Sequence, residues 1–247
     1  MICCICEKPI LDAYYSDYWG NTSHIEHLGK KPFFCNSCGR IIGKLSTLGR
    51  KKQMGFKMKD DRIICGICEE SSIKNQKQID TSFKFVLALL KKIHVFNNAE
   101  NISISIEDKI KLSKRASNKP VEGLCCSKIL NVNNNTKVLS DIYILSGLPK
   151  IQFESVLCHE VLHHWLNTNE IKQGIFDEGF CNIGEALVLN YYIATKDDKL
   201  AYYLRERANK NPDFYYGLQF LKLKSKLKNN GWKIFINEII NRKEIKL

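Results

Sequence analysis

Residues 159–163 read His-Glu-Val-Leu-His (HEVLH), and this pentapeptide restricts the fold more than any other part of the chain. Two histidines four residues apart share one face on an α-helix, where both imidazoles can bind one zinc ion. The glutamate between them is then placed to act on a zinc-bound water. The chain has only six histidines, and three of them stand at 159, 163 and 164. The pattern predicts a metal-binding helix with His159 and His163 as ligands and Glu160 as the catalytic residue. A helix that carries two histidines by chance is the alternative.

A third ligand is expected from the next helical segment. Fourteen residues separate His163 from Glu178, which opens an apolar stretch at 183–193 that reads as a helix. Zinc hydrolases keep three protein ligands and leave a fourth position for water, and two histidines with one glutamate is a standard set. Asn182, one turn beyond Glu178, could accept the second ring N–H of a zinc-binding histidine. The alternatives are a carboxylate that favours the helix dipole for Glu178 and an ordinary surface amide for Asn182.

The first 68 residues carry four pairs of Cys or His, each pair with two residues between its members. That gap lets a tight turn offer both side chains to one ion, so four pairs predict two tetrahedral structural zinc sites. A cross-braced arrangement would combine the same pairs differently, and Cys4 competes with Cys3 for the register. Bound metal would substitute for a core that so short a segment cannot build. In chain order the two sites are Cys3, Cys6, His24 and His27, and then Cys35, Cys38, Cys65 and Cys68.

Cysteine usage indicates the compartment. Six of the eleven cysteines form three Cys-x-x-Cys pairs, which is metal spacing, whereas secreted disulfide scaffolds are usually shorter chains. No run approaches the ~20 apolar residues of a membrane span, and the N-terminus does not read as a cleavable signal. We therefore expect zinc thiolates in a cytoplasmic protein with no membrane contact. Cys158, beside His159, is expected to be a buried packing residue.

The formal net charge of +12 gathers at the two ends of the chain. A basic tail with interleaved tyrosine and phenylalanine could bind nucleic acid or another polyanion. However, Lys222, Lys224, Lys226 and Lys228 have period two, while the apolar residues among them follow a helical stripe. The lysines are therefore expected to coat a solvated face, and nucleic acid is the less favoured partner.

Composition divides the chain into two domains. The module at 1–70 is followed by a polar stretch at 71–80 that we interpret as a linker, and a domain at 81–247 follows. Period-two patterns predict strands at 101–107 and 138–148. A small sheet followed by helices is an α+β layout, and the strand before the HEVLH helix could accept an extended peptide as a further strand. Helices are expected at 81–93, from 151 onward, and near 199–209, 213–228 and 231–242.

Taken together, these motifs resemble those of the LIM-domain, ubiquitin-activated peptidases that limit organ growth in plants (the "Da-one" family) and of their bacterial relatives. The front end resembles their divergent LIM module, and Gly123-Leu124-Cys125 is similar to the segment that opens their peptidase domain. No ubiquitin-interacting motif precedes the module, so the resemblance is to a bacterial-type relative. Four further segments resemble family motifs: 146–149 (SGLP), 156–165 (VLCHEVLHHW), 177–181 (DEGFC) and, near the end, 211–217.

The resemblance implies a LIM-like double zinc-binding module followed by a mostly helical, zincin-type and gluzincin-like metallopeptidase domain with a small β-sheet. It implies zinc ligands at His159, His163 and Glu178 and the catalytic glutamate at Glu160, in agreement with the chemistry of these residues. Three zinc ions are expected, one catalytic and two structural. The implied partners are a protein or peptide substrate and a protein bound at the LIM-like module.

Three functions compete on these residues. In a zinc metallopeptidase, Glu160 takes a proton from the zinc-activated water and passes it to the leaving amine. A LIM-type binding scaffold with a catalytically silent peptidase domain is the second, and the intact HEVLH and Glu178 argue against it. A basic, nucleic-acid-binding zinc protein is the third. Packing roles are expected for the residues that could otherwise stabilise an oxyanion: His164, Tyr191, Tyr192, Tyr215 and Tyr216.

Overall fold

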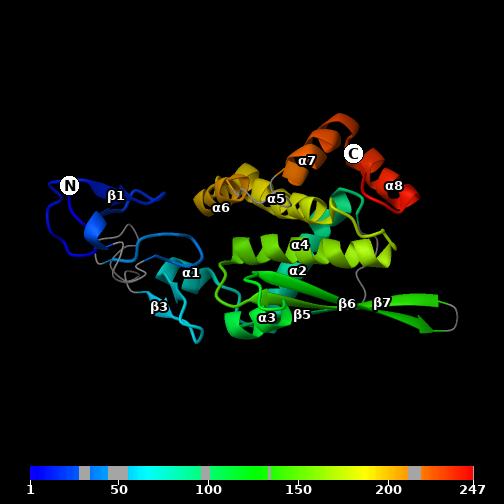
Figure 1. Ribbon diagram of the computed structural model, residues 1–247, viewed down its shortest axis with the longest axis horizontal. Helices are drawn as coiled ribbons and strands as arrows, with labels where there is room; N and C mark the ends of the chain where they lie inside the picture. The colour runs from blue at the N-terminus through cyan, green and yellow to red at the C-terminus, as the bar shows by residue number, and fades with distance from the viewer. Residues whose placement is uncertain (28–33, 44–54, 96–100, 133–134, 211–217, 247) are drawn as a thin grey trace. The chain divides into compact units, whose positions relative to one another are not determined.

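A computed structural model describes residues 1–27, 34–43, 55–95, 101–132, 135–210 and 218–246 (Figure 1). The chain forms two compact units. The first comprises Met1–Lys74 together with Ser146–Lys150, and the second comprises Asn75–Leu145 and Ile151–Leu247. The segment at 211–217, which resembles a family motif, lies outside the described residues, as do Tyr215 and Tyr216.

The described part of the first unit contains short antiparallel hairpins and short helical segments. The buried Asp17 organises its first half, since its carboxylate accepts hydrogen bonds from the backbone N–H groups of Trp19 and Asn21, each at 2.9 Å, and of Ile41 at 2.7 Å. One acidic side chain thus joins a hairpin turn to a segment about twenty residues away. The elements are β1 (Tyr14–Ser16) paired with β2 (Thr22–His24), η1 (Ile25–His27), β3 (Phe56–Lys57) paired with β4 (Ile63–Ile64), and α1 (Gly66–Ser71).

The segment Ser146–Lys150 returns to this first unit from much later in the chain. Arg62 donates a hydrogen bond of 2.8 Å to the Ser146 carbonyl, and the Ser37 hydroxyl donates one of 3.3 Å to the Gly147 carbonyl. Gly147 has a φ of +75°, a conformation that side chains with a Cβ rarely adopt. These contacts explain why the strand expected at 138–148 ends earlier, at Leu145.

The second unit contains a three-stranded sheet in the order β5-β7-β6. β5 (Ile102–Glu107) runs parallel to β7 (Asn135–Leu145), and β6 (Gly123–Val132) pairs antiparallel with β7 on its other side. The strand expected at 101–107 is confirmed as β5. Because β7 is the central strand, the hypothesis that the strand before the HEVLH helix accepts a further strand is wrong. The sheet edges are β5 and β6.

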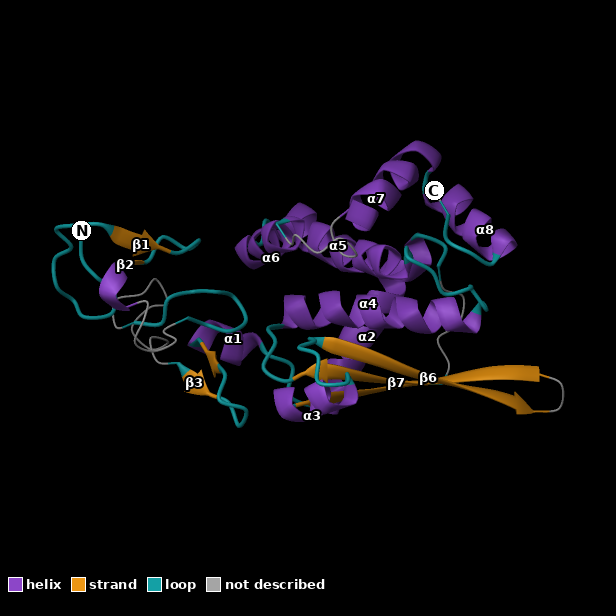
Figure 2. Cartoon of the chain, viewed as in Figure 1, coloured by secondary structure: helices purple, strands orange, loops and turns teal. Residues whose placement is uncertain are grey.

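Helix α4 (Lys150–Thr168), which carries HEVLH, lies on the sheet and is covered on its other side by α5 (Asp177–Lys196), as Figures 1 and 2 show. Helices expected from 151 onward and near 199–209 and 231–242 are confirmed as α4, α6 and α8. The helix near 213–228 is confirmed as α7 within the described residues. The remaining helices are α2 (Gln76–Lys92), α3 (Lys109–Arg115), α6 (Lys199–Asn209), α7 (Leu218–Asn230) and α8 (Trp232–Arg242).

Helix α4 forms the centre of the core. Fifteen of its nineteen residues are buried, so it has no solvated face of the kind seen on surface helices. On one side it packs against Ile142 and Ile144 of β7, which are fully buried. On the other side the Trp165 ring lies 5.6 Å from Phe180 of α5, which lies 6.2 Å from Phe235 of α8. The HEVLH residues therefore lie on a helix that is packed on both sides.

A buried carboxylate links three of these helices. Glu154 of α4 has no solvent exposure and accepts a hydrogen bond of 2.9 Å from Ser82 of α2 and one of 2.6 Å from Tyr192 of α5. Burial and the bond to Glu154 raise the pKa of Tyr192, which remains a donor throughout the ordinary pH range. A buried carboxyl group with hydrogen bonds to both neighbouring helices fixes their relative orientation.

The linker expected at 71–80 is wrong in part, because α2 begins at Gln76. Asn75 caps this helix by accepting from the Gln78 backbone N–H at 3.0 Å, and the Gln78 side chain accepts in return from the Asn75 backbone. Polar residues that resemble linker composition thus form a capping box. The helix expected at 81–93 consequently starts five residues earlier.

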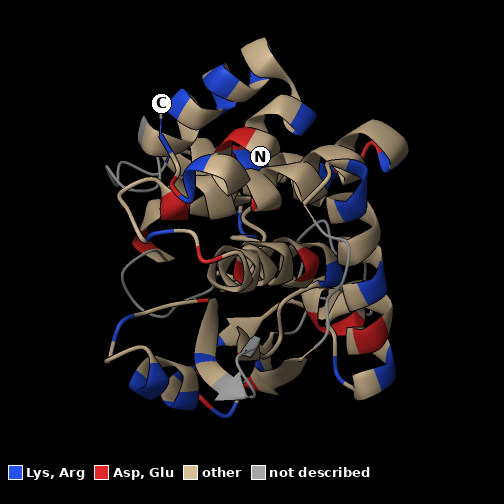
Figure 3. Cartoon of the chain, turned by 90° about the vertical axis from the view of Figure 1, so that its right-hand side faces the viewer, with Lys and Arg blue, Asp and Glu red and all other residues tan. Residues whose placement is uncertain are grey.

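The basic tail coats a solvated surface, as expected. Lys222, Lys224 and Lys228 of α7 are exposed, whereas Lys226 pairs with Glu238 at 3.1 Å. Figure 3 shows Lys and Arg positions distributed over several helices of the second unit. None of the helices in the described ranges is both long and apolar enough to cross a membrane.

Candidate metal centre

Helix α4 places the two HEVLH histidines side by side. Their Nε2 atoms lie 3.1 Å apart and their ring centroids 4.9 Å apart. His159 is buried, and the side chain of His163 is one quarter exposed. The i, i+4 spacing thus gives the predicted arrangement, with both ring nitrogens turned to one point.

Glu178 brings a carboxylate to the same point from the first turn of α5. Its Oε2 lies 3.3 Å from His159 Nε2, and its Oε1 lies 3.5 Å from His163 Nε2. Ligand atoms at about 2.0–2.1 Å from one zinc ion in tetrahedral geometry are separated by about 3.3–3.4 Å. The three observed separations therefore suit a shared zinc ion, and the donor set of two imidazoles and one carboxylate is one that zinc uses.

The pKa shifts of His163 and Glu178 agree with a cation at this point. For His159, by contrast, burial is outweighed by the adjoining carboxylates of Glu178 and Glu185, which raise its pKa. Burial and the nearby His159 together lower the pKa of His163 to about 4, so the His163 ring is neutral and can be a ligand. Burial raises the pKa of Glu178, but the contacts with His159 and His163 outweigh burial and the net shift is downward. A neutral imidazole and an ionised carboxylate are the forms that bind metal.

Glu160 lies against strand β6. It is buried, burial raises its pKa to about 7, and the backbone N–H of Cys125 donates a hydrogen bond to it. Gly123 permits this approach, since a Cβ at residue 123 would lie 2.6 Å from both Glu160 Oε1 and Val156 Cγ1. The Gly123-Leu124-Cys125 segment thus provides both the space and a donor for the Glu160 carboxylate.

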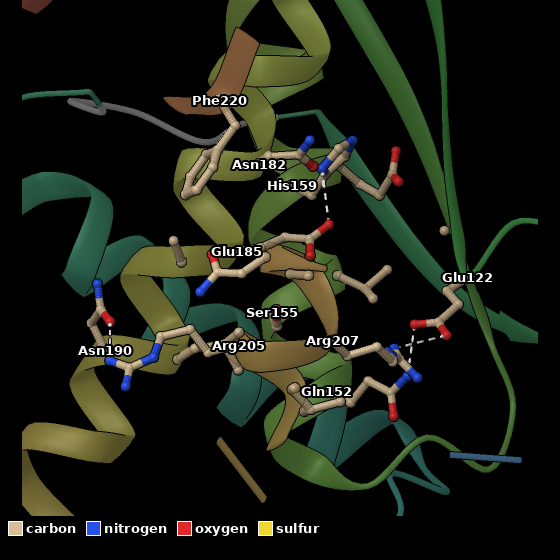
Figure 4. A pocket seen from close by; sticks show the side chains of 18 of the residues that line it. Glu122, Gln152, Ser155, His159, Asn182, Glu185, Asn190, Arg205, Arg207 and Phe220 are labelled. Atoms are coloured by element: carbon tan, nitrogen blue, oxygen red, sulfur yellow. Dashed lines mark hydrogen bonds and ion pairs between the residues drawn. The ribbon is translucent and has the colours of Figure 1, made fainter. Parts of the chain in front are cut away.

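The outer nitrogen of His159 is approached by Glu185, not by Asn182 as we expected. His159 Nδ1 lies 3.1 Å from Glu185 Oε1, and Figure 4 shows this contact between two residues that line the cavity. Asn182 lines the cavity near His159 instead. Glu185 is seven residues after Glu178 and so shares its helical face, which was the available signal for it. A carboxylate behind a histidine ligand fixes its tautomer and raises its basicity.

Cys181 is a ligand-type residue at this centre that the sequence reasoning missed. Its sulfur and the nitrogens of His159 and His163 lie within 4.8 Å of one another. Cys181 is fully buried, and burial raises its pKa well above the ordinary value, so its thiol remains protonated. The carboxylate of Glu178 contacts both imidazoles directly and is therefore the better third ligand. Cys158 is buried, as expected for a packing residue.

A cavity of about 630 Å³ opens beside His159 and Glu160. Its walls come from the segment before β6, from α4 and α5, and from α6 and α7. The residues for which packing roles were expected do not line it within the described part of the chain, which includes His164, Tyr191 and Tyr192. His164 is hydrogen-bonded to Ser140 of β7 at 2.7 Å, and Tyr192 to Glu154. Packing and structural hydrogen bonds thus account for both residues.

The first unit brings together its first four predicted ligands. Cys6 Sγ lies 3.4 Å from His24 Nδ1, and the His24 and His27 rings are 5.6 Å apart. Burial raises the pKa of Cys3, but hydrogen bonds from Cys6 and from nearby backbone outweigh burial and lower it to about 6. Burial raises the pKa of Cys4 to about 12. Cys3, with Cys6, His24 and His27, therefore belongs to a group that could hold a metal ion, and Cys4 does not.

The remaining four cysteines form a separate, buried group that could also hold a metal ion: Cys35, Cys38, Cys65 and Cys68. Cys38 Sγ and Cys65 Sγ are 3.7 Å apart, close to the roughly 3.8 Å between two sulfurs bound to one tetrahedral zinc ion. Hydrogen bonds among the four side chains lower the pKa of Cys35 and raise the pKa values of Cys38 and Cys68. The grouping follows chain order and is not cross-braced.

Comparison with known proteins finds a family match that lies within the second unit and the loop at 146–150. Residues 99–212 match the family model of the DA1-like proteins, described as Protein DA1. No curated protein and no solved structure matches the chain. The matched residues include His159, Glu160, His163 and Glu178, whereas the first-unit ligands lie outside the match. Through residues 99–212, this chain is related to the DA1 family, as its motifs predicted.

Proposed function

We propose that this protein is a zinc-dependent peptidase that hydrolyses peptide bonds of protein substrates. The observation that carries the proposal is the convergence of His159 Nε2, His163 Nε2 and the Glu178 carboxylate within 3.5 Å of one another, with Glu160 buried beside them. The relationship to the DA1 family supports it. A helix bearing HEVLH on a small sheet, with the third ligand on the next helix, also supports a zincin-type domain.

The catalytic role falls to Glu160. His159, His163 and Glu178 would hold the zinc ion, which would polarise a substrate carbonyl and lower the pKa of a bound water to about 7. The Glu160 carboxylate accepts the proton of the attacking water and then delivers it to the leaving amine. The Cys125 N–H orients this carboxylate, and the close approach of Gly123 confines it to one side. Glu185 holds the His159 ring in the tautomer that leaves Nε2 free for metal.

Zinc content per chain and peptidase activity test the proposal together. The wild-type chain is expected to hold three zinc ions, and His163→Ala and Glu178→Ala two each. Cys181→Ala is the matched control, because it removes a neighbouring ligand-type atom and is expected to retain three. Three ions in Glu178→Ala together with two in Cys181→Ala would assign the third ligand to the cysteine.

Glu160→Gln separates catalysis from metal binding. This variant is expected to keep three zinc ions and the wild-type unfolding temperature while it loses at least about 100-fold in kcat/KM, the lower end of a general acid–base contribution. Quenched fluorescent peptides and an unfolded protein substrate are suitable assays. Undiminished cleavage by Glu160→Gln would refute the assignment, and the silent-scaffold hypothesis would then lead.

We further propose that the first unit binds a protein partner or the protein substrate. Tyr14 and Tyr15 on β1 and Tyr18 in the following turn are exposed, together with Ile25. Exposed aromatic residues are enriched at protein interfaces. Replacing Tyr14 and Tyr18 with serine is expected to slow cleavage of folded protein substrates and to leave cleavage of short peptides unchanged. Equal loss on both kinds of substrate would contradict a binding role.

A further inference from the structure

Carboxylates and cationic side chains both line the cavity beside the metal centre, and Glu160 is one of the carboxylates. Glu122 accepts a hydrogen bond of 2.7 Å from Gln152 and lies 3.3 Å from the Arg207 guanidinium, and Glu185 lies against His159. These carboxylates therefore already have cationic or hydrogen-bonding partners within the protein. Figure 4 shows the contacts of Glu122 with Gln152 and Arg207 and the contact of Glu185 with His159.

Arg205 differs from these residues. It projects from α6 into the same cavity and is half-buried. Its guanidinium lies 5.2 Å from the centre of the Tyr202 ring, and its Nη1 donates to the neutral Asn190 amide oxygen at the long distance of 3.5 Å. Lys224 of α7 also lines the cavity, with its ammonium 5.7 Å from the Phe220 ring. Neither cation has a carboxylate partner within the described ranges of the chain. A half-buried guanidinium whose contacts are an amide and an aromatic ring, both neutral, favours an external anion.

The cavity walls determine what kind of anion fits. Apolar side chains, among them Val156, Leu189, Leu204 and Phe220, alternate with the polar ones around this space. A space of about 630 Å³ admits one or two amino-acid side chains of a bound peptide. The carboxylate of such a peptide would meet the planar, bidentate donor geometry of arginine.

We propose that this cavity binds a carboxylate of the peptide substrate, and that Arg205 selects it. The carboxylate belongs either to an acidic side chain near the scissile bond or to the free C-terminus of the peptide. The inference rests on the proposed peptidase function, since it assigns the cavity to the substrate of that reaction. Arg205 is a specificity-determining residue here and takes no part in proton transfer.

Binding of labelled peptides to the Glu160→Gln protein tests the inference without turnover. One set of peptides carries a single glutamate moved through each position of a neutral, C-terminally amidated sequence. A second set carries glutamine at the same positions, and a third adds a free C-terminal carboxylate to the glutamine peptides. Fluorescence anisotropy at fixed salt gives each Kd. At least one carboxylate peptide is expected to bind about tenfold or more tightly than its neutral counterpart.

A second variant tests whether Arg205 is responsible for this preference for a carboxylate. Arg205→Gln in the Glu160→Gln background is expected to remove the difference between carboxylate and neutral peptides. Lys199→Gln is the matched control, because Lys199 lies on the same helix, is exposed and does not line the cavity. The peptide set that shows the preference identifies the source, a side chain or the C-terminus. Equal binding of all peptides, no binding, or a preference that survives in Arg205→Gln would overturn the inference.

The two proposals fail separately. Cleavage of peptides by the wild-type chain with no preference for a carboxylate would overturn the role of Arg205 and leave the peptidase proposal intact. Carboxylate-selective binding that depends on Arg205, without cleavage of any peptide, would support the role of Arg205 and overturn the peptidase proposal.

Discussion

Gly123→Ala is a minimal change that should disable catalysis without removing any metal ligand. The new Cβ would lie 2.6 Å from Glu160 Oε1, 2.9 Å from Glu160 Cγ and 2.6 Å from Val156 Cγ1. Ordinary contact begins at 3.4 Å, so the carboxylate has to move by about 0.8 Å or β6 has to move away from α4 by a similar distance. Either movement also strains the hydrogen bond from the Cys125 N–H.

The size of the effect follows from that displacement. A misplacement of about 1 Å at a reacting group can cost about 100-fold in rate, so kcat/KM for a peptide should fall by about that factor. Overpacking of this kind also destabilises a fold by about 1–3 kcal/mol. Because no metal ligand changes, zinc content should stay at the wild-type value. The combination of retained zinc and lost activity distinguishes this outcome from general unfolding.

The assay compares Gly123→Ala with Gly174→Ala. A Cβ at residue 174 would meet only the Lys172 carbonyl oxygen, at 4.0 Å, so this control should keep wild-type activity and stability. Cleavage of a quenched peptide, zinc analysis and urea unfolding are measured on both variants. Full activity of Gly123→Ala would refute the reasoning that the β6 backbone positions Glu160.

Three further perturbations test the surroundings of the centre. Glu185→Ala removes the carboxylate 3.1 Å from His159 and should weaken zinc affinity about 10–100-fold in a chelator competition, while an unchanged affinity would show that the contact is incidental. Tyr192→Phe removes a 2.6 Å hydrogen bond to the buried Glu154 and should lower the free energy of unfolding by about 1–3 kcal/mol in urea, with no change in zinc content. Gly184→Ala places a Cβ 2.5 Å from Leu162 of α4. Because this contact separates the two helices that carry the ligands, the free energy of unfolding should fall by about 1–3 kcal/mol and zinc affinity should fall as well. A Gly184→Ala protein with normal affinity would show that α5 can shift without moving Glu178.

Local sequence pattern was sufficient to predict those residues of the metal centre that lie on a single helix or turn. The HEVLH spacing predicts a shared face because 3.6-residue periodicity relates His159 to His163 in any α-helix. The position of Glu178 in the first turn of α5 was also predictable, because the apolar stretch that follows it has helical spacing. The first-unit ligands were predictable as groups, since each pair lies on its own tight turn.

The contacts between elements were not predictable in the same way. Asn182 and Glu185 both lie on the side of α5 that faces α4, and the spacing of the two helices decides which one reaches His159. That spacing depends on Gly184, whose missing side chain lets α5 approach α4. Strand β6 escaped detection because its sequence, which begins Gly-Leu-Cys-Cys-Ser, lacks clean alternation, although it pairs antiparallel with the next strand, β7, from Val132 and Asn135 onward.

The segment Ser146–Lys150 has a consequence for how this protein can be taken apart. It sits between β7 and α4 along the chain, yet its carbonyl groups accept hydrogen bonds from Arg62 and Ser37 of the first unit. A cut near residue 74 would therefore not yield two independent pieces, because the loop that leads into the HEVLH helix would lose these donors. We therefore expect that deleting or exchanging the front module disturbs this loop, unless the replacement supplies equivalent hydrogen-bond donors.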